Sequence, residues 1–200
     1  MKKLLITFFA LFTALFTSLS AASSDELILE CAHAYKNVLR FNEIPAYELT
    51  SVSNAIIVIP RFYKGGLLLG GAGGKGVMIE KKDGAWIPSG VNSGSASIGA
   101  QIGYEKNILV LYIINSAIVE QIKSSKFTLS AEIAASFGNK GSSLNKLSEV
   151  NFSGAIYAYS NNSGLFAGTS LGGAVISANN ESFSTASYGF NELINALGNN

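Results

Sequence analysis

Two glycine-rich stretches and one Cys/His pair have residue types that other proteins use for chemistry. The first, GAGGKG at residues 71–76, has the glycine spacing of a dinucleotide-binding loop. Such a loop requires a helix directly after the glycines, because the helix N-terminus binds the pyrophosphate. Here Val77, Met78 and Ile79 predict a continuing strand instead. We therefore expect these glycines to let the strand bend or another backbone approach closely.

The second stretch, GTSLG at residues 168–172, matches the nucleophile elbow of serine hydrolases, with Ser170 in the nucleophile position. That chemistry requires a strand, a sharp turn and a helix, together with a histidine base later in the chain. The single histidine is His33, early in the sequence, and residues 173–176 predict more strand. Carboxylates are scattered singly, so no acid–base pair is indicated. We predict a protein that is not an enzyme.

Cys31 and His33 are the residues most suited to bind a metal. They lie two positions apart in a predicted helix and so point to different faces. A single cysteine cannot form an internal disulfide, and we expect Cys31 to be a small buried apolar side chain. His33 is expected at the helix surface. No metal or cofactor is predicted.

Residues 1–22 have the layout of a secretory signal peptide. Lys2 and Lys3 precede an uncharged stretch over residues 4–19, and the small residues Ser20, Ala21 and Ala22 follow. Cleavage is expected after residue 22, and retention as an N-terminal anchor is the alternative. Export to the periplasm or cell envelope follows from this interpretation.

Residues 23–200 are expected to form one domain, because the chain has 200 residues with three prolines and shows no linker. Removing Lys2 and Lys3 from the 14 basic residues leaves 12 basic against 13 acidic residues. The mature chain is therefore nearly neutral, and its overall charge gives no argument for nucleic-acid binding.

The pattern of apolar residues predicts many strands with helices near both ends. The predicted strands are residues 55–59, 67–69, 77–80, 85–87, 94–104, 108–114 (covered on both sides), 127–137, 150–160 and 165–177. The first predicted helix begins at Ser23, with a capping box formed with Glu26, and stops before Pro45. A short helical turn is predicted at 47–51. Two further helices are predicted, one near 117–123 capped by Asn115 or Ser116, and one at 190–197. Tight turns are predicted at residues 81–84 and 161–164. The fold class is α+β, with a curved antiparallel sheet or partly closed β-barrel.

A basic and aromatic corner is predicted between the first two strands. Pro60 ends an apolar run, and Arg61, Tyr63 and Lys64 flank Phe62. With the blocks that follow, this stretch resembles the SYLF domain, the Ysc84-type lipid-binding family, over residues 54–197. The blocks are Pro60 with Gly65-Gly66, residues 73–77, Trp86 with Pro88-Ser89, residues 99–103 with Glu105, Tyr159-Ser160, residues 164–168 with Leu171 and Gly173, and Tyr188-Gly189.

The resemblance implies lipid binding without catalysis. Eukaryotic members are associated with phosphoinositides and actin structures, which an exported chain does not routinely meet. What carries over is recognition of an anionic phospholipid or membrane surface. The candidate lipid-binding residues are Arg61, Phe62, Tyr63, Lys64, Lys75, Lys81 and Lys82. Each basic residue near an anionic membrane contributes about 1 kcal/mol, so Phe62 or Tyr63 is expected to add apolar contact.

Two other functions fit the same residues. A structural or protein-interaction module of the cell envelope, without lipid specificity and with an envelope protein as partner, is one. A carrier that encloses an apolar ligand inside the curved sheet is the other. The sequence leaves the lipid and the oligomeric state open.

Overall fold

The structure of the chain, a computed structural model, describes residues 23–41, 46–66, 69–98, 103–125, 127–129, 155–161 and 174–198. The helices in these ranges are α2 (Ser24–Phe41), α3 (Ala46–Val52), α4 (Ser116–Lys123) and α7 (Tyr188–Gly198). The strands are β1 (Ala55–Gly66), β2 (Leu69–Lys82), β3 (Ala85–Ile98), β4 (Gly103–Ile113), β5 (Phe127–Thr128), β6 (Ile156–Ser160) and β7 (Val175–Ala178). The predicted α+β class is confirmed.

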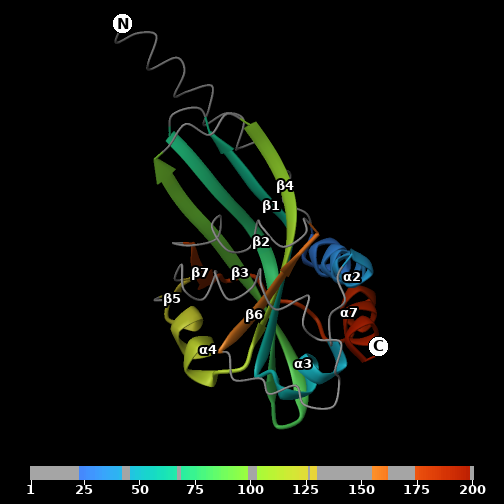
Figure 1. Ribbon diagram of the computed structural model, residues 1–200. Helices are drawn as coiled ribbons and strands as arrows, with labels where there is room; N and C mark the ends of the chain where they lie inside the picture. Colours follow the sequence, from blue (N-terminus) through green and yellow to red (C-terminus); the bar gives the residue numbers. More distant parts are fainter. Residues whose placement is uncertain are drawn as a thin grey trace, which may run out of the picture.

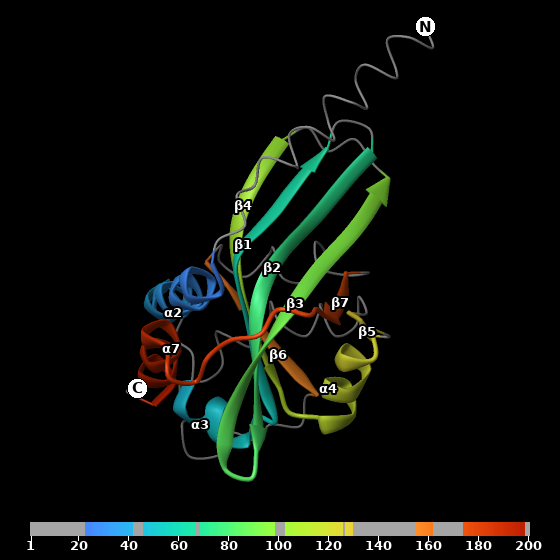
Figure 2. The ribbon, with the colours of Figure 1, turned by 180° about the vertical axis from the view of Figure 1, so that it is seen from behind.

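The strands form one seven-stranded antiparallel sheet in the order β5-β7-β3-β2-β1-β4-β6. The sheet curls into a half-barrel, with α2 and α7 side by side against one face and α4 on the opposite side (Figure 1). Seen from behind, the four long strands extend well beyond the helices at one end, while the β2–β3 hairpin projects beside α3 at the other (Figure 2). The predicted curved antiparallel sheet is therefore confirmed.

Alternation of side chains along the central strands builds a core on each face of the sheet. One face packs Ile56, Val58, Val77, Ile79, Val110 and Tyr112 against α2 and α7. The other packs Ile57, Ile59, Met78, Leu109, Leu111 and Ile113 against Ile118, Val119 and Ile122 of α4. The expectation that the strand at 108–114 is covered on both sides is confirmed.

Helix α2 begins as its capping box predicts, because the Ser23 hydroxyl accepts a hydrogen bond of 3.2 Å from the Glu26 amide. It ends at Phe41, and Pro45 lies outside the described residues. Helix α7 approaches it closely at Gly189, where a Cβ atom would lie 2.6 Å from Ile28 Cγ2. The short helices at α3 and α4 are also confirmed, with Asn115 as the cap of α4.

The predicted corner after Pro60 is wrong. Strand β1 continues from Ala55 to Gly66, and its pairing with both neighbours shifts register around Pro60 and Arg61. Proline lacks the amide that a central strand donates, and a β-bulge is where a sheet tolerates it. The bulge therefore keeps residues 61–64 inside the sheet.

The glycines of β2 allow a close backbone approach, as predicted. A Cβ atom on Gly76 would meet the Val58 carbonyl oxygen, and one on Gly74 would meet the Arg61 carbonyl oxygen; each would also lie 2.8 Å from a Cγ atom of Ile59. Both glycines face the bulged part of β1. The strand continues through Val77, so no helix N-terminus follows the glycines, and the dinucleotide-loop geometry is absent here.

The turn at residues 81–84 is confirmed, because Asp83 and Gly84 have φ values of 50° and 81° and reverse the chain between β2 and β3. The single strand predicted over residues 94–104 is wrong. Residues 94–98 end β3, while residues 103–104 begin β4. Continuous alternation does not show where a chain changes strand.

The strands predicted at 150–160 and 165–177 do not pair with each other in the parts of them that the structure describes. The described part of the first, β6, pairs with β4, and that of the second, β7, pairs with β3 and β5. Residues 1–22, the Gln101 block, residues 130–154, the turn beyond residue 161, the GLFAG block and Ser170 lie outside the described residues.

Candidate functional site

The predicted basic residues lie at two separate levels along the strands. Arg61 and Lys64 are on β1, and Lys81 and Lys82 are at the hairpin end of β2. Residue Ala55 pairs with Glu80, whereas Lys64 pairs with Ala72. At about 3.3 Å per residue, the two levels are roughly 25–30 Å apart. Lys75 lies between them, with its amine 4.0 Å from the Glu181 carboxylate. The structure does not bring the predicted residues together into one patch.

At the β1 level, the basic side chain is tied to a helix and the aromatic one is buried. The Arg61 guanidinium lies 2.6 Å from the Glu30 carboxylate of α2. Phe62 is 0% exposed and belongs to the core on the α4 side. Phe62 does not supply the apolar contact expected of Phe62 or Tyr63, because the bulge turns its side chain into the core. Tyr63 and Lys64 are partly buried.

At the other level, Lys81 lies over an aromatic ring and next to α3. Its amine is 5.8 Å from the ring centroid of Trp86, the residue opposite it in β3, and 3.4 Å from the Ser51 carbonyl, to which it donates. Helix α3 carries two exposed apolar side chains, Tyr47 (61% exposed) and Val52 (42%). The hairpin tip is therefore not purely basic.

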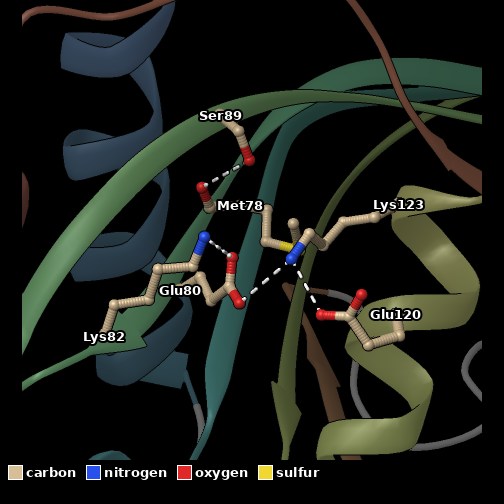
Figure 3. Close-up of polar contacts among 6 residues, drawn as sticks. All are labelled: Met78, Glu80, Lys82, Ser89, Glu120 and Lys123. Carbon is tan, nitrogen blue, oxygen red and sulfur yellow. Dashed lines mark hydrogen bonds and ion pairs between the residues drawn. The ribbon is translucent and has the colours of Figure 1, made fainter.

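Lys82 is part of a chain of four charges that joins the hairpin to α4 (Figure 3). The Glu80 carboxylate lies 3.2 Å from the Lys82 amine and 3.4 Å from the Lys123 amine. Lys123 also lies 2.8 Å from Glu120, and this hydrogen bond raises the pKa of Lys123. Glu120 and Lys123 lie one turn apart on the solvent side of α4 and pair there.

Ile87 places a further apolar side chain beside this network. It pairs with Glu80 across the β2–β3 ladder, so both side chains leave the same face of the sheet. Ile87 is 41% exposed. We define the hairpin end as the two lysines of the tip and the apolar side chains around them: Val52, Lys81, Lys82, Trp86 and Ile87.

The charges around the hairpin end balance. Lys81, Lys82 and Lys123 face three carboxylates, on Glu80, Asp83 and Glu120. A shallow groove of about 250 Å³ lies between α4, the end of β2 and Asn54, which precedes β1. It is lined by Asn54, Glu80, Lys81, Ser116, Ala117, Val119 and Glu120. The Lys82 side chain is more exposed (49%) than that of Glu80 (16%), whereas the Glu120 side chain is more exposed (68%) than that of Lys123 (35%). Attraction to a negatively charged surface must therefore depend mainly on the two lysines of the tip.

Sequence reasoning missed the apolar half of the hairpin end. The Asp83-Gly84 turn indicated that Lys81 and Lys82 lie at a tip, and Trp86 was recognised only as a family residue. The exposure of Val52 and Ile87 depends on how α3 packs beside the hairpin. No local pattern in the sequence reports that packing.

The groups that could do chemistry elsewhere belong to the core or to solvent. Cys31 is buried, donates to the Val58 carbonyl at 3.3 Å, and has its pKa raised by burial, which keeps it a thiol. His33 is exposed on the other side of α2, as predicted. Within the described ranges, no three His, Cys, Asp or Glu residues cluster to hold a metal ion.

A buried tyrosine cluster lies under α2. A hydrogen bond of 2.7 Å joins the hydroxyls of Tyr35 and Tyr112, and the ring of Tyr159 meets that of Tyr112 edge to face at 6.0 Å. Burial raises the pKa of all three, that of Tyr159 to about 12. The hydroxyls therefore stay neutral at physiological pH and stabilise the contact between helix and sheet.

In the part of the chain that the structure describes, no helix has the length and apolar character to cross a membrane. No solved structure matches the chain. A family model described as "Las17-binding protein actin regulator", Ysc84, matches residues 94–194, which is half of the chain.

Three relatives of known name match the chain over about two thirds of its length. Protein YSC84 of Saccharomyces cerevisiae is 35% identical over 141 residues, which are 66% of this chain and 29% of that protein. LAS seventeen-binding protein 3 of the same yeast is 36% identical over 130 residues, 61% of this chain and 27% of that protein. The human SH3 domain-containing YSC84-like protein 1 is 29% identical over 136 residues, 66% of this chain and 39% of that protein.

The matched region spans less than half the length of these relatives. One of them is named as a binding protein and another as a protein that contains an SH3 domain. The family model and the relatives agree with the SYLF resemblance carried by the sequence blocks. The chain belongs to the Ysc84 family, whose domain is the SYLF domain.

Proposed function

We propose that this protein is an exported, non-catalytic domain that binds anionic phospholipid surfaces through its hairpin end. The observation that supports the proposal most is the exposure of apolar side chains around two lysines at a projecting tip. Val52 and Ile87 are 42% and 41% exposed on either side of Lys81 and Lys82. Side chains of this kind can enter the interfacial region of a bilayer while the amines meet lipid phosphates.

The magnitudes favour a weak and reversible contact. Full burial of an exposed Val or Ile side chain contributes about 1.5–3 kcal/mol, so the exposed parts of Val52 and Ile87 contribute about 1 kcal/mol each. Lys81 and Lys82 add about 1 kcal/mol each. The sum of about 4 kcal/mol corresponds to a Kd of about 1 mM. Both the apolar and the basic part are needed.

This proposal moves the main contact away from Arg61, Phe62, Tyr63, Lys64 and Lys75. Arg61 and Lys75 lie near the carboxylates of Glu30 and Glu181, and Phe62 is buried. Their lipid-binding role stays a prediction, and the experiments below compare it directly with the hairpin end. Export is supported by the signal-peptide layout of residues 1–22.

Binding to another protein is the second candidate function. The matching family is described as Las17-binding, and one yeast relative has the same activity in its name. For an exported chain, the corresponding partner is a protein of the cell envelope. An exposed apolar end with balanced charges also suits such a partner.

Vesicle co-sedimentation tests the proposal. The processed protein is mixed with vesicles of phosphatidylglycerol and phosphatidylcholine, or of phosphatidylcholine alone, at low salt. Preferential sedimentation with the anionic vesicles is expected. Equal recovery with both kinds of vesicle removes the recognition of anionic lipid. Recovery with neither removes lipid binding altogether and leaves the protein-interaction function.

A further inference from the structure

We propose that Glu80 is a built-in counter-ion that competes with lipid phosphate for the amines of Lys82 and Lys123. The inference rests on the proposed function, because it concerns how the hairpin end engages a bilayer. It adds Lys123 to the candidate binding residues and makes Glu80 a residue that weakens binding.

The geometry of the three side chains gives Glu80 this role. Its carboxylate lies within 3.2 Å of Lys82 and 3.4 Å of Lys123, from two different elements (Figure 3). The Glu80 side chain is 16% exposed, whereas those of Lys82 and Lys123 are 49% and 35% exposed. The amines therefore lie on the solvent side of the carboxylate, where a phosphate can reach them first.

The exchange of partners needs only side-chain motion. Each lysine has a flexible four-carbon stem and three donors, so its amine can turn from Glu80 to a phosphate without moving the backbone. Helix α4 stays in place when Lys123 turns, because Ile118, Val119 and Ile122 hold it to the sheet in the core. Partly exposed ion pairs are weak, so a bilayer with many phosphates can compete with them.

Glu80→Gln tests this role. The variant keeps the size of the side chain, frees the Lys82 amine, leaves the Lys123 amine with Glu120 alone, and shifts the local balance of charge to +1. We expect apparent affinity for phosphatidylglycerol vesicles to rise about fivefold at low salt, because Lys82 loses its counter-ion and Lys123 loses one of its two. Thermal unfolding of each variant checks that the fold is intact.

Asp83→Asn is the matched control. It removes one negative charge at the same tip, but Asp83 makes no ion pair in the described part of the chain. Asparagine also accepts the positive φ of 50° at this position. We expect its affinity to rise by less than about twofold. In the triple variant Glu80→Gln, Lys82→Gln, Lys123→Gln, the gain is expected to disappear.

The outcomes separate the two proposals. If wild-type protein binds vesicles and Glu80→Gln binds no more tightly than Asp83→Asn, the counter-ion role is overturned and lipid binding stands. If the gain survives in the triple variant, the lysines are not the groups that Glu80 restrains, and the inference is equally overturned. If neither wild type nor Glu80→Gln binds, both proposals are overturned.

Discussion

The amine of Lys81 lies 5.8 Å from the ring centroid of Trp86, directly across the β2–β3 ladder. The pair leaves the sheet on the face toward α3, where Val52 is exposed, while Ile87 leaves the opposite face. Basic and apolar groups thus surround the projecting hairpin on both faces. A surface of this kind makes the apolar and the electrostatic contributions to binding separable by mutation.

Replacing the exposed apolar side chains should weaken vesicle binding without unfolding the protein. The double variant Val52→Ser, Ile87→Ser loses about 2 kcal/mol of apolar contact. Its affinity for anionic vesicles should therefore fall about thirtyfold. Vesicle co-sedimentation measures this change. Val175→Ser is the control, because Val175 is 43% exposed but lies on β7. A similar loss in the control would place the contact elsewhere.

Charge replacement distinguishes the two levels of the sheet. Binding of the wild type to anionic vesicles is expected to weaken as the screening length shrinks to about 8 Å at physiological salt. The double variant Lys81→Gln, Lys82→Gln should lose most of this salt-dependent binding. Arg61→Gln, Lys64→Gln should retain wild-type affinity within about twofold and lose about 1 kcal/mol of stability, because the ion pair with Glu30 is broken. The reverse result would return the site to β1.

Processing of the chain is the third prediction. The basic, apolar and small-residue order of residues 1–22 should direct cleavage after Ala22 during export. Expression with the complete sequence, followed by N-terminal sequencing of the exported product, should give Ser23 as the first residue. Recovery of Met1 at the N-terminus would show that the segment is retained.

Features decided by neighbouring residues could be predicted from the sequence. Ser23 and Glu26 act within one turn of helix, and Asp83-Gly84 reverses the chain by itself, so both predictions are confirmed. The end of a strand is different, because a proline can be held in a sheet by strands on both sides. Pro60 predicts the end of a strand because proline lacks the amide that a central strand donates. The prediction is wrong here because β2 and β4 pair with β1 on both sides of Pro60.

In the candidate site, too, features decided by neighbouring residues could be predicted, and features decided by distant residues could not. The exposure of Lys81 and Lys82 follows from the turn, which the sequence indicates. The burial of Phe62 does not, because one bulge exchanges the faces of every later residue in the strand. The Glu80–Lys123 contact joins residues from two elements distant in the sequence, and pairing of that kind has no local signal.

Gly76 tests the close approach of β1 and β2. In Gly76→Ala the new methyl group would meet Ile59, whose Cγ1 atom lies 2.8 Å from the Cβ position. Overpacking of this kind should lower the free energy of unfolding by about 1–3 kcal/mol. Gly71→Ala is the control, since its nearest neighbour would be at an ordinary 3.8 Å. Denaturant unfolding of both variants should show a large loss for Gly76→Ala alone.

The tyrosine cluster predicts loss of stability in alkali. Tyr35, Tyr112 and Tyr159 have folded-state pKa values above 10, because burial disfavours the phenolate, and that of Tyr159 is about 12. The unfolded chain therefore releases these protons at lower pH than the folded chain does. Their contribution to stability is complete below pH 10 and is lost as pH rises from about 10 toward 12.

Unfolding of wild type and Tyr159→Phe by denaturant at pH 8 to 11.5 measures this effect. The free energy of unfolding of wild type should fall steadily above pH 10, and the fall should be shallower in Tyr159→Phe, since one titrating group has been removed. Tyr188→Phe, at a side chain that is 69% exposed, serves as the control and should keep the wild-type slope. If Tyr159→Phe and Tyr188→Phe follow the same curve as wild type, then burial of Tyr159 does not couple its ionisation to folding.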